Sequence, residues 1–373
     1  MIFDLKAVLR VALALVCAGV LSLSLTPLAK AFATKVGAID VPKDDRRMHK
    51  KPIPRMGGLA IFLAFFLTAL LFLKQIDRPM QAILLGAIAI VILGVFDDIY
   101  TLHALFKLIV QISAACIVVF YGGCRIQYIT NPFGNAGDYF DLGVFAIPLT
   151  IVWIVAITNA VNFIDGLDGL ACGVSCITSV NMLVIALLVS DQNVAIVMAA
   201  IAGACLGFLP YNFNPAKIFM GDTGSTFLGF LLASISIQGL FKAYAVVSLA
   251  VPFLLLSLPI FDICFAIIRR LASGKNPMEA DRGHFHHRLI DLGFSQKQSV
   301  AIAYLLTAIL GLAAVLLTSS GEMKVIIMLL AVVVVGAIGF EIFFRDKRYH
   351  KQVQEEKELL KEQKQREEQH EQD

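Results

Sequence analysis

Charged residues are scarce in this chain. Only 16% of its 373 residues are Asp, Glu, Lys or Arg, whereas 58% are hydrophobic, and the mean hydropathy is +0.80. A soluble domain carries roughly 25% charged residues, so the composition excludes a soluble globular protein. The sequence leaves no room for a separate soluble catalytic domain, and any chemistry must use the loops between apolar segments.

Two common kinds of site are also missing. The seven cysteines form no CxxC pair and mostly lie inside apolar runs, which favours a role as small buried side chains. The glycine-containing segment 219–225 (FMGDTGS) is not followed by Gly-Lys-Ser/Thr, so it is not a Walker phosphate-binding loop.

Apolar runs that could cross a bilayer, each of about 20 residues, recur along the whole chain. We count about eleven by this length criterion: 8–28, 57–74, 80–96, 104–121, 143–162, 169–190, 193–210, 222–239, 245–268, 299–318 and 324–344. The sequence therefore predicts an all-α polytopic membrane protein, with one membrane domain over 1–344. The charged tail 345–373 is predicted to be a solvated helix or disordered.

The first apolar run has some features of a signal peptide. Lys6 and Arg10 precede most of it, and Ala31-Phe32-Ala33 resembles a cleavage site. We expect the run to be retained, because cleavage would leave the basic loop that follows it outside the cell, against the positive-inside rule.

Lys and Arg gather in alternate loops. With the N-terminus outside, the loops 30–56 and 269–298 and the start of the tail lie inside, and all three are basic, whereas the outside segments carry only scattered charges. This bias predicts a cytoplasmic C-terminus and a plasma-membrane location. The outside segment 121–142 contains Asn131-Pro132 and Gly134-Asn135, which predict a small external β-hairpin.

Five aspartates interrupt or end apolar runs, and the same alternation of loops places all of them on the cytoplasmic side. They are Asp97, Asp98, Asp165, Asp168 and Asp222. A charge at the middle of a membrane helix costs roughly 2.5–3.5 kcal/mol, and gathered carboxylates repel one another by about 4 kcal/mol per close pair. A divalent cation and a phosphate-bearing substrate would remove this conflict, so the pattern favours a membrane enzyme that acts on phosphate.

Adjacent carboxylates end the third apolar run at Asp97 and Asp98. Neighbouring side chains on a helix point about 100° apart, so one would face a metal and the other a substrate or a basic loop. The alternative is an acidic helix end solvated at the membrane interface. Lys107, about one turn into the next run, would contact a phosphate or pair with one of these aspartates.

The segment 158–169 (TNAVNFIDGLDG) is the densest polar stretch in an apolar context. Asn159 and Asn162 are three residues apart, as are Asp165 and Asp168, so each pair would share a helix face. Their oxygens suit Mg²⁺ or a nucleoside, and backbone amides near glycine suit phosphate. A plain polar turn is the alternative.

Three further segments carry candidate ligands. Asp222 would cap a helix or hold a metal that bridges to a diphosphate. The segment 281–289 (DRGHFHHRL) contains three histidines and two arginines, which suit a diphosphate; zinc is disfavoured because no cysteine is near and the other ligands are hard oxygens. The loop 44–58 is basic and would attract an anionic substrate, or simply contact lipids.

In this order, the segments RRMHKKPIPRMGG, GVFDD, NAVNFIDGLDG, GDTGS and HFHHRL resemble those of the polyprenyl-phosphate N-acetylhexosamine-1-phosphate transferase family, over roughly residues 8–344. Such enzymes join a cytoplasmic UDP-sugar to a lipid phosphate and release UMP. Phe285 interrupts the histidines, which resembles the branch that uses UDP-N-acetylglucosamine rather than the phospho-N-acetylmuramoyl-pentapeptide branch, where three histidines are consecutive.

The resemblance implies a role for each candidate residue. Catalytic residues would be Asp97, Asp98, Lys107 and His284; residues that bind substrate would be Lys51, Arg55, Asn159, Asp165, Asp168, Arg282, His286 and His287; Asp222 and Asn162 would bind Mg²⁺, or Mn²⁺ in its place. The implied partners are undecaprenyl phosphate, UDP-N-acetylglucosamine and membrane lipids, with a homodimer as one oligomeric state and no nucleic acid.

One question about the mechanism and one about the class of protein stay open at the sequence level. The lipid phosphate would attack the β-phosphorus directly, or an aspartyl-phosphate would form first. The competing class of protein is a cation-coupled transporter, which would place acids near the middle of several spans.

Overall fold

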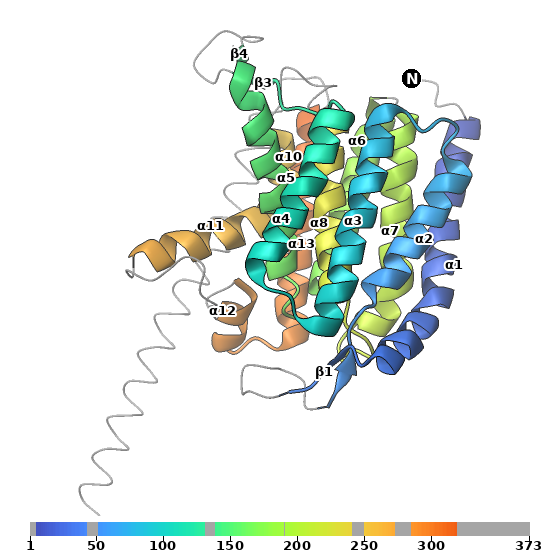
Figure 1. Cartoon of the computed structure of the whole chain (residues 1–373), viewed down its shortest axis with the longest axis vertical. Coiled ribbons are helices and arrows are strands. Elements are labelled where there is room, and N and C mark those ends of the chain that lie inside the picture. Colours follow the sequence, from blue (N-terminus) through green and yellow to red (C-terminus); the bar gives the residue numbers. More distant parts are fainter. Residues whose placement is uncertain are drawn as a thin grey trace, which may run out of the picture.

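The computed structural model describes residues 5–42, 51–130, 139–189, 191–240, 250–272 and 285–318. Its long helices run along a common direction as one bundle (Figure 1). They are α1 (Leu5–Val36), α2 (Gly58–Phe72), α3 (Arg78–Tyr100), α4 (Ala104–Cys116), α5 (Ala146–Phe163), α6 (Leu170–Leu188), α7 (Gln192–Asn212), α8 (Gly221–Ile235) and α13 (Gln296–Thr318).

The centre of the bundle is α8. It packs against α3 and α5, and its residues from Thr223 to Ile235 are all buried. A helix that is apolar and covered on every side belongs inside a bundle rather than at a lipid surface. Its first turn carries Asp222, so the fold places this carboxylate at the end of the central helix.

Small residues let the outer helices pack closely. α1 packs on α7 and α2, and Ala14 and Ala18 of α1 are fully buried. A Cβ on Gly203 or Gly207 of α7 would collide with the backbone of α1, which is the close approach typical of membrane helices. α1 is longer than its predicted apolar run and continues through Ala31–Ala33.

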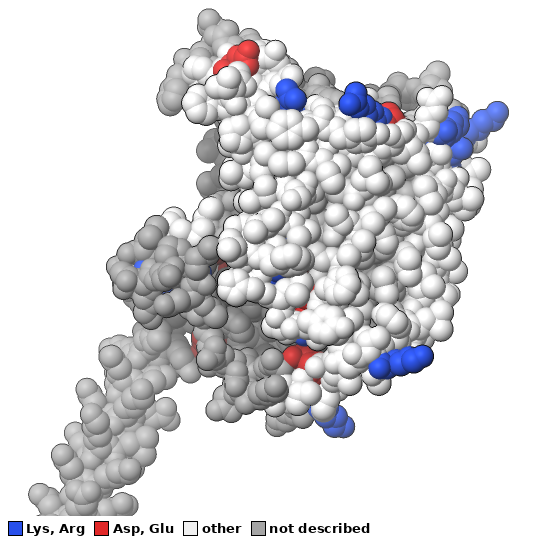
Figure 2. All heavy atoms as spheres, viewed as in Figure 1, with Lys and Arg blue, Asp and Glu red and all other residues white. Residues whose placement is uncertain are grey.

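Seven of the described helical segments are long and apolar enough to cross a membrane. They are 5–36, 78–100, 104–121, 143–163, 170–188, 192–212 and 296–318. Figure 2 shows a broad uncharged band over this face, with Lys and Arg at both ends of it. The polytopic membrane class is confirmed, whereas a total of eleven spans stays a prediction, and the run 324–344 lies outside the described residues.

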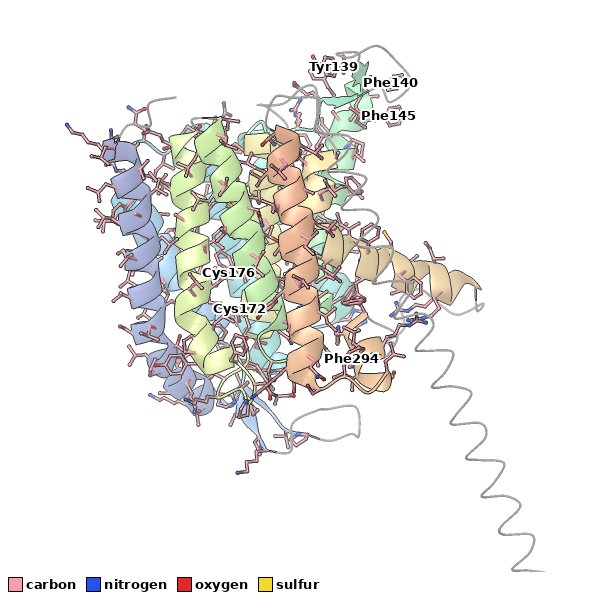
Figure 3. All side chains as sticks on the ribbon, turned by 180° about the vertical axis from the view of Figure 1, so that it is seen from behind. Tyr139, Phe140, Phe145, Cys172, Cys176 and Phe294 are labelled. Atoms are coloured by element: carbon pink, nitrogen blue, oxygen red, sulfur yellow. The ribbon has the colours of Figure 1, made fainter. Side chains whose placement is uncertain are left out.

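Two small pairs of strands mark opposite ends of the bundle (Figure 1). β1 (Ile39–Asp40) pairs with β2 (Ile53–Pro54), and β3 (Tyr128–Thr130) pairs with β4 (Tyr139–Asp141), both antiparallel. In Figure 3, Tyr139, Phe140 and Phe145 lie at the β3–β4 end, and Phe294 lies at the other. The β3–β4 pair lies at the same end of the bundle as the start of α1 (Figure 1), and the side of the membrane that it faces stays a prediction.

The apolar run 245–268 is interrupted rather than continuous. α10 (Ala250–Leu255) ends before Leu256, and α11 (Ser257–Ala272) leaves the bundle sideways (Figure 1). Proline has no N–H, so Pro259 cannot donate to the carbonyl of Leu255. The hydroxyl of Thr178 on α6 donates to that carbonyl instead, at 3.1 Å, and so satisfies the acceptor at the break.

The remaining described elements are short. η1 (Ile117–Tyr121) and η3 (Ser236–Leu240) are π-helical turns that continue α4 and α8, and η2 (Gly143–Phe145) precedes α5. α12 (Phe285–Asp291) lies between α11 and α13, at the end of the bundle that holds β1 (Figure 1).

Candidate active site

A lysine joins two of the predicted aspartates. The ammonium nitrogen of Lys107 lies 2.8 Å from Asp97 Oδ2 and 3.1 Å from Asp222 Oδ2. The three side chains come from α4, α3 and α8. Of the two roles that the sequence left open for Lys107, the structure shows pairing with an aspartate, and it adds a second aspartate to the pair.

Asn162 lies on the other side of Asp222. Its amide nitrogen donates to Asp222 Oδ1 at 3.2 Å and to Ser225 Oγ at 2.7 Å. Asp222 therefore has a cation at one oxygen and an amide at the other, which holds the carboxylate in one orientation at the start of α8.

Asp98 has a different environment from its neighbour Asp97. Its Oδ1 accepts the backbone N–H of Asp222 at 3.0 Å, and its Oδ2 accepts the N–H and the hydroxyl of Thr223 at 3.1 and 2.6 Å. These donors belong to the first turn of α8, whose N–H groups have no partner within the helix. Asp98 thus caps α8 from α3. Gly221, which lies against this carboxylate, has a φ of 73°, where only glycine is free of strain.

The segment after β2 connects the basic loop to the residues around the start of α8. The N–H groups of Gly57 and Gly58 donate to the carbonyls of Phe219 and Met220 at 2.9 and 2.8 Å. The Nε of Arg55 donates to the carbonyl of Asp98 at 3.1 Å. Arg55 is therefore fixed beside the ends of α3 and α8, as a substrate-binding role would require.

A cavity of about 1000 Å³ opens beside these groups. Of the predicted residues, Lys51, Arg55, Asp98, Asp165, Asp168, Asp222 and His287 line it. Ligand-binding cavities typically measure 300–1000 Å³, so this one is at the upper end of the range. The structure thus brings together side chains from loops that are far apart in the sequence, as the alternation of loops predicted.

Asp165 lies half-buried in the loop between α5 and α6. Burial and the charges of Asp222, Asp98 and Asp168 raise the pKa of its carboxyl well above the usual range. A cationic ligand in the cavity would offset this repulsion and would therefore stabilise the charged form of Asp165.

Asp168 holds the neighbouring loop. Its Oδ2 accepts the amide of Asn214 at 2.9 Å and the N–H of Ala216 at 3.0 Å. Asn214 also donates to Gln296 at 2.6 Å. The carboxylate thus shapes the wall of the cavity as well as lining it.

Asn159 is not among the residues that line the cavity. Its amide pairs with that of Gln111 on α4, with N–O distances of 2.7 and 3.3 Å. The pair joins α5 to α4 one turn beyond Lys107, so the structure gives Asn159 a part in aligning helices.

The histidine segment reaches the same cavity from α12. His286 is 3% exposed and packs against Gly166, where a Cβ would collide with the imidazole. The rings of His286 and His287 are 4.3 Å apart. Arg282 and His284 lie outside the described residues.

The oxygen ligands around Asp222 suit Mg²⁺ when substrate and water complete its shell. Among the described residues, no group of three or more His, Cys, Asp and Glu side chains is arranged to hold a metal. Mg²⁺ uses one or two carboxylates and completes its shell with water and substrate phosphates. Asp222 and the amide oxygen of Asn162 fit that requirement, and Asp97 is joined to Asp222 through Lys107.

Sequence reasoning missed several residues that line the cavity. They are Lys30, Asp40, Asn212, Asn214, Lys217, Phe219 and Gln296. A signal for most of them was present, because the polar stretch NFNPAK at 212–217 lies in a loop that the alternation places on the cytoplasmic side.

Comparisons with known proteins find relatives that match most of the chain. The sequence model of "Glycosyl transferase family 4" matches residues 80–240. The chain is 42% identical, over 84% of its own length and 87% of the relative, to a probable undecaprenyl-phosphate N-acetylglucosaminyl 1-phosphate transferase of Bacillus subtilis. It is 36% identical, over 80% and 79%, to a decaprenyl-phosphate N-acetylglucosaminephosphotransferase of Mycolicibacterium smegmatis. A phospho-N-acetylmuramoyl-pentapeptide-transferase of Clostridium botulinum is 32% identical over 75% and 91%.

Proposed function

Since this chain belongs to glycosyl transferase family 4, we propose that it transfers N-acetylglucosamine-1-phosphate from UDP-N-acetylglucosamine to undecaprenyl phosphate. The products are UMP and undecaprenyl-diphosphate-N-acetylglucosamine, the first lipid-linked intermediate of a cell-wall or surface polysaccharide such as a teichoic acid or lipopolysaccharide. The reaction takes place at the cytoplasmic face of the plasma membrane. The Bacillus subtilis and Mycolicibacterium smegmatis relatives, which bear the names of N-acetylglucosamine enzymes, are more similar to the chain than the Clostridium botulinum muramoyl-pentapeptide enzyme is.

The bridge from Asp97 through Lys107 to Asp222 is the observation that carries this proposal. It places a cation between two carboxylates at the end of a membrane bundle, next to a large polar cavity. The charged residues that line the cavity lie at one end of the bundle rather than at mid-depth. That arrangement supports a reaction at the membrane surface over an ion path through the bundle.

The lipid phosphate attacks the β-phosphorus in line, and UMP leaves. A phosphate monoester is largely dianionic at pH 7, because its second pKa is about 6, so a strong general base is hardly needed. Catalysis then consists mainly of positioning and of charge neutralisation by Lys107, Arg55 and Lys51. Asp97 or Asp98 orients the lipid phosphate: Asp98 lines the cavity, whereas Asp97 acts through Lys107, with which it pairs.

We assign Mg²⁺ to Asp222 and Asn162. The cavity lining contains five aspartates against four Lys and Arg residues (Lys30, Lys51, Arg55 and Lys217). The protein alone therefore does not neutralise a bound diphosphate, and the metal, when bound, supplies the missing positive charge. Asp165 faces the nucleotide side of the cavity, and His287 faces the diphosphate.

UMP release by the purified protein tests the proposal. The reaction contains UDP-N-acetylglucosamine and undecaprenyl phosphate, with Mg²⁺ or with EDTA, and runs beside Asp222→Asn. We expect release that needs both the lipid and Mg²⁺ and is lost in the variant. Release only with UDP-N-acetylmuramoyl-pentapeptide would move the protein to the other branch, and a phosphoenzyme trapped without lipid would overturn the direct attack.

A further inference from the structure

A buried carboxylate lies on the helix that leaves the bundle. Asp262 of α11 is 4% exposed, although the residue before it, Phe261, is 62% exposed. The Oδ1 of Asp262 accepts the backbone N–H of Phe285 at 2.6 Å. A short, buried hydrogen bond to a carboxylate is among the stronger contacts that a side chain makes to a backbone.

Phe285 begins the helix that carries the histidines. α12 starts at this residue, and His286 and His287 follow it directly. His286 packs against Gly166, and His287 lines the cavity. The hydrogen bond that Asp262 accepts from the N–H of Phe285 therefore fixes the backbone next to the two imidazoles.

A second contact joins the same two helices. The guanidinium carbon of Arg288 lies 4.7 Å from the ring centre of Phe265. Phe265 lies three residues after Asp262 and four after Phe261, so its ring lies between the buried carboxylate and the exposed stripe of Phe261 and Ile268, which are 62% and 64% exposed. α12 therefore contacts α11 at the buried Asp262 and at the edge of its exposed stripe.

The chemistry of position 262 needs an explanation that packing does not supply. A carboxylate that is 4% exposed has lost most of its hydration, so it needs hydrogen-bond donors to offset the cost of burial. The N–H of Phe285 at the start of α12 is one such donor. No residue of α11 is among those that the sequence predicted for the site.

We propose that Asp262 is a positioning residue that holds the first turn of α12, so that His286 and His287 stay beside the Gly166 loop. The side chain acts through the backbone of Phe285 and does not touch the reacting atoms. The catalytic part of the proposal rests on the proposed function, since it takes the histidine segment to face the diphosphate.

Three variants test this role in the full-length protein. Asp262→Leu keeps the approximate volume and removes the acceptor, whereas Asp262→Asn keeps an oxygen that accepts from the Phe285 N–H. Phe261→Leu is the matched control, because it changes the neighbouring outward-facing residue of the same helix. UMP release is expressed per UMP-binding site, measured by titration, so that loss of folded protein does not count as loss of turnover.

We expect Asp262→Leu to lower turnover per site by about 10- to 100-fold, because displacements of about 1 Å cost that much in a positioned site. Asp262→Asn and Phe261→Leu should stay within about threefold of the parent protein, less than the loss of one hydrogen bond. A second measurement does not depend on activity. Diethyl pyrocarbonate acylates accessible imidazoles, so mass spectrometry should find His286 protected in the parent and reactive in Asp262→Leu.

Unchanged turnover per site together with a protected His286 in Asp262→Leu would overturn the proposal. So would a loss confined to the number of binding sites, or an equal loss in Asp262→Asn. If the parent protein releases no UMP with either donor, the proposed function fails, but the protection of His286 still reports whether Asp262 holds α12.

Discussion

The Nζ of Lys107 lies 3.1 Å from Asp222 Oδ2, although the two residues are 115 positions apart in the sequence. This ion pair joins the start of α4 to the start of the central helix. Its second branch reaches Asp97 at 2.8 Å. The three side chains form one charged unit, so a change at any of them alters the other two.

Lys107→Met should abolish UMP release, with a loss of at least about 1000-fold, the scale of other groups that stabilise charge in phosphoryl transfer. The change leaves Asp97 and Asp222 facing each other without the cation between them. Steady-state UMP release measures this effect. Lys74→Met, which removes a lysine at the opposite end of the bundle, should leave the rate unchanged, and an active Lys107→Met would contradict the charge argument.

Asp98→Asn should lower stability more than Asp97→Asn does. Both oxygens of Asp98 accept hydrogen bonds from the first turn of α8. An asparagine amide turns one acceptor into a donor that faces a backbone N–H, which costs about 1–3 kcal/mol when buried. At Asp97 the flexible Lys107 retains Asp222 as a partner. Thermal unfolding in detergent compares the two variants.

The same pair separates capping from catalysis. Asp97→Asn should lose turnover while it keeps most of its thermal stability, and Asp98→Asn should lose both. If Asp98→Asn unfolds at the same temperature as the parent, Asp98 does not cap α8, and the case for a direct catalytic role returns.

The sequence predicted the membrane class and the meeting of distant loops at one cavity, because both depend on patterns that recur along the chain. Apolar runs of bilayer length identify helices, and the alternation of basic loops places Asp98, Asp165 and Asp222 on one side. These features need only composition and spacing.

Other features depend on contacts that no spacing encodes. Asp97 and Asp98 are adjacent and chemically identical, yet one pairs with Lys107 and the other caps α8. The break between α10 and α11 needs Pro259 and also the hydroxyl of Thr178 to satisfy the freed carbonyl. The sequence predicted that Asn159 binds substrate, whereas in the structure its amide pairs with that of Gln111, which is 48 residues away.

Gln111 and Asn159 should be energetically coupled. The two side-chain amides pair with each other, and Asn159 also donates to the carbonyl of Val155. A change of either to leucine leaves the other amide without one of its partners, at a cost of about 1–3 kcal/mol where it is buried. The double change removes both polar groups and should recover much of this loss. Thermal or chemical unfolding of the four proteins in a double-mutant cycle gives the coupling.

The same variants also test whether the amide pair affects UMP release. The single variants should lower UMP release by tilting α4, which carries Lys107, relative to α5. Additive effects on stability, with no coupling, would show that the amide pair does not align the two helices.

Asp165→Asn should stabilise the protein at pH 8 while it lowers activity. Burial and three neighbouring carboxylates raise the pKa of Asp165 in the folded state, whereas the unfolded chain has a value of about 3.9. Between these values the folded state binds more protons than the unfolded state, so the stability of the folded state falls as the pH rises. Asparagine carries no charge, so this loss disappears in the variant.

The pH dependence of unfolding tests whether the charge on Asp165 destabilises the folded protein as the pH rises. The thermal unfolding midpoints of the parent and Asp165→Asn should agree near pH 4, and the variant should have the higher midpoint toward pH 8. UMP release by the variant should fall about 100-fold, as for a lost charged contact. Asp141→Asn is the matched control, because it lies on β4 at the opposite end of the bundle and its amide oxygen can still accept from the N–H of Gly143, so it should gain no stability at pH 8. Equal pH profiles for the parent and Asp165→Asn would mean that Asp165 is not held among like charges. A site that is more stable without one of its acids would be a site built to hold a cation.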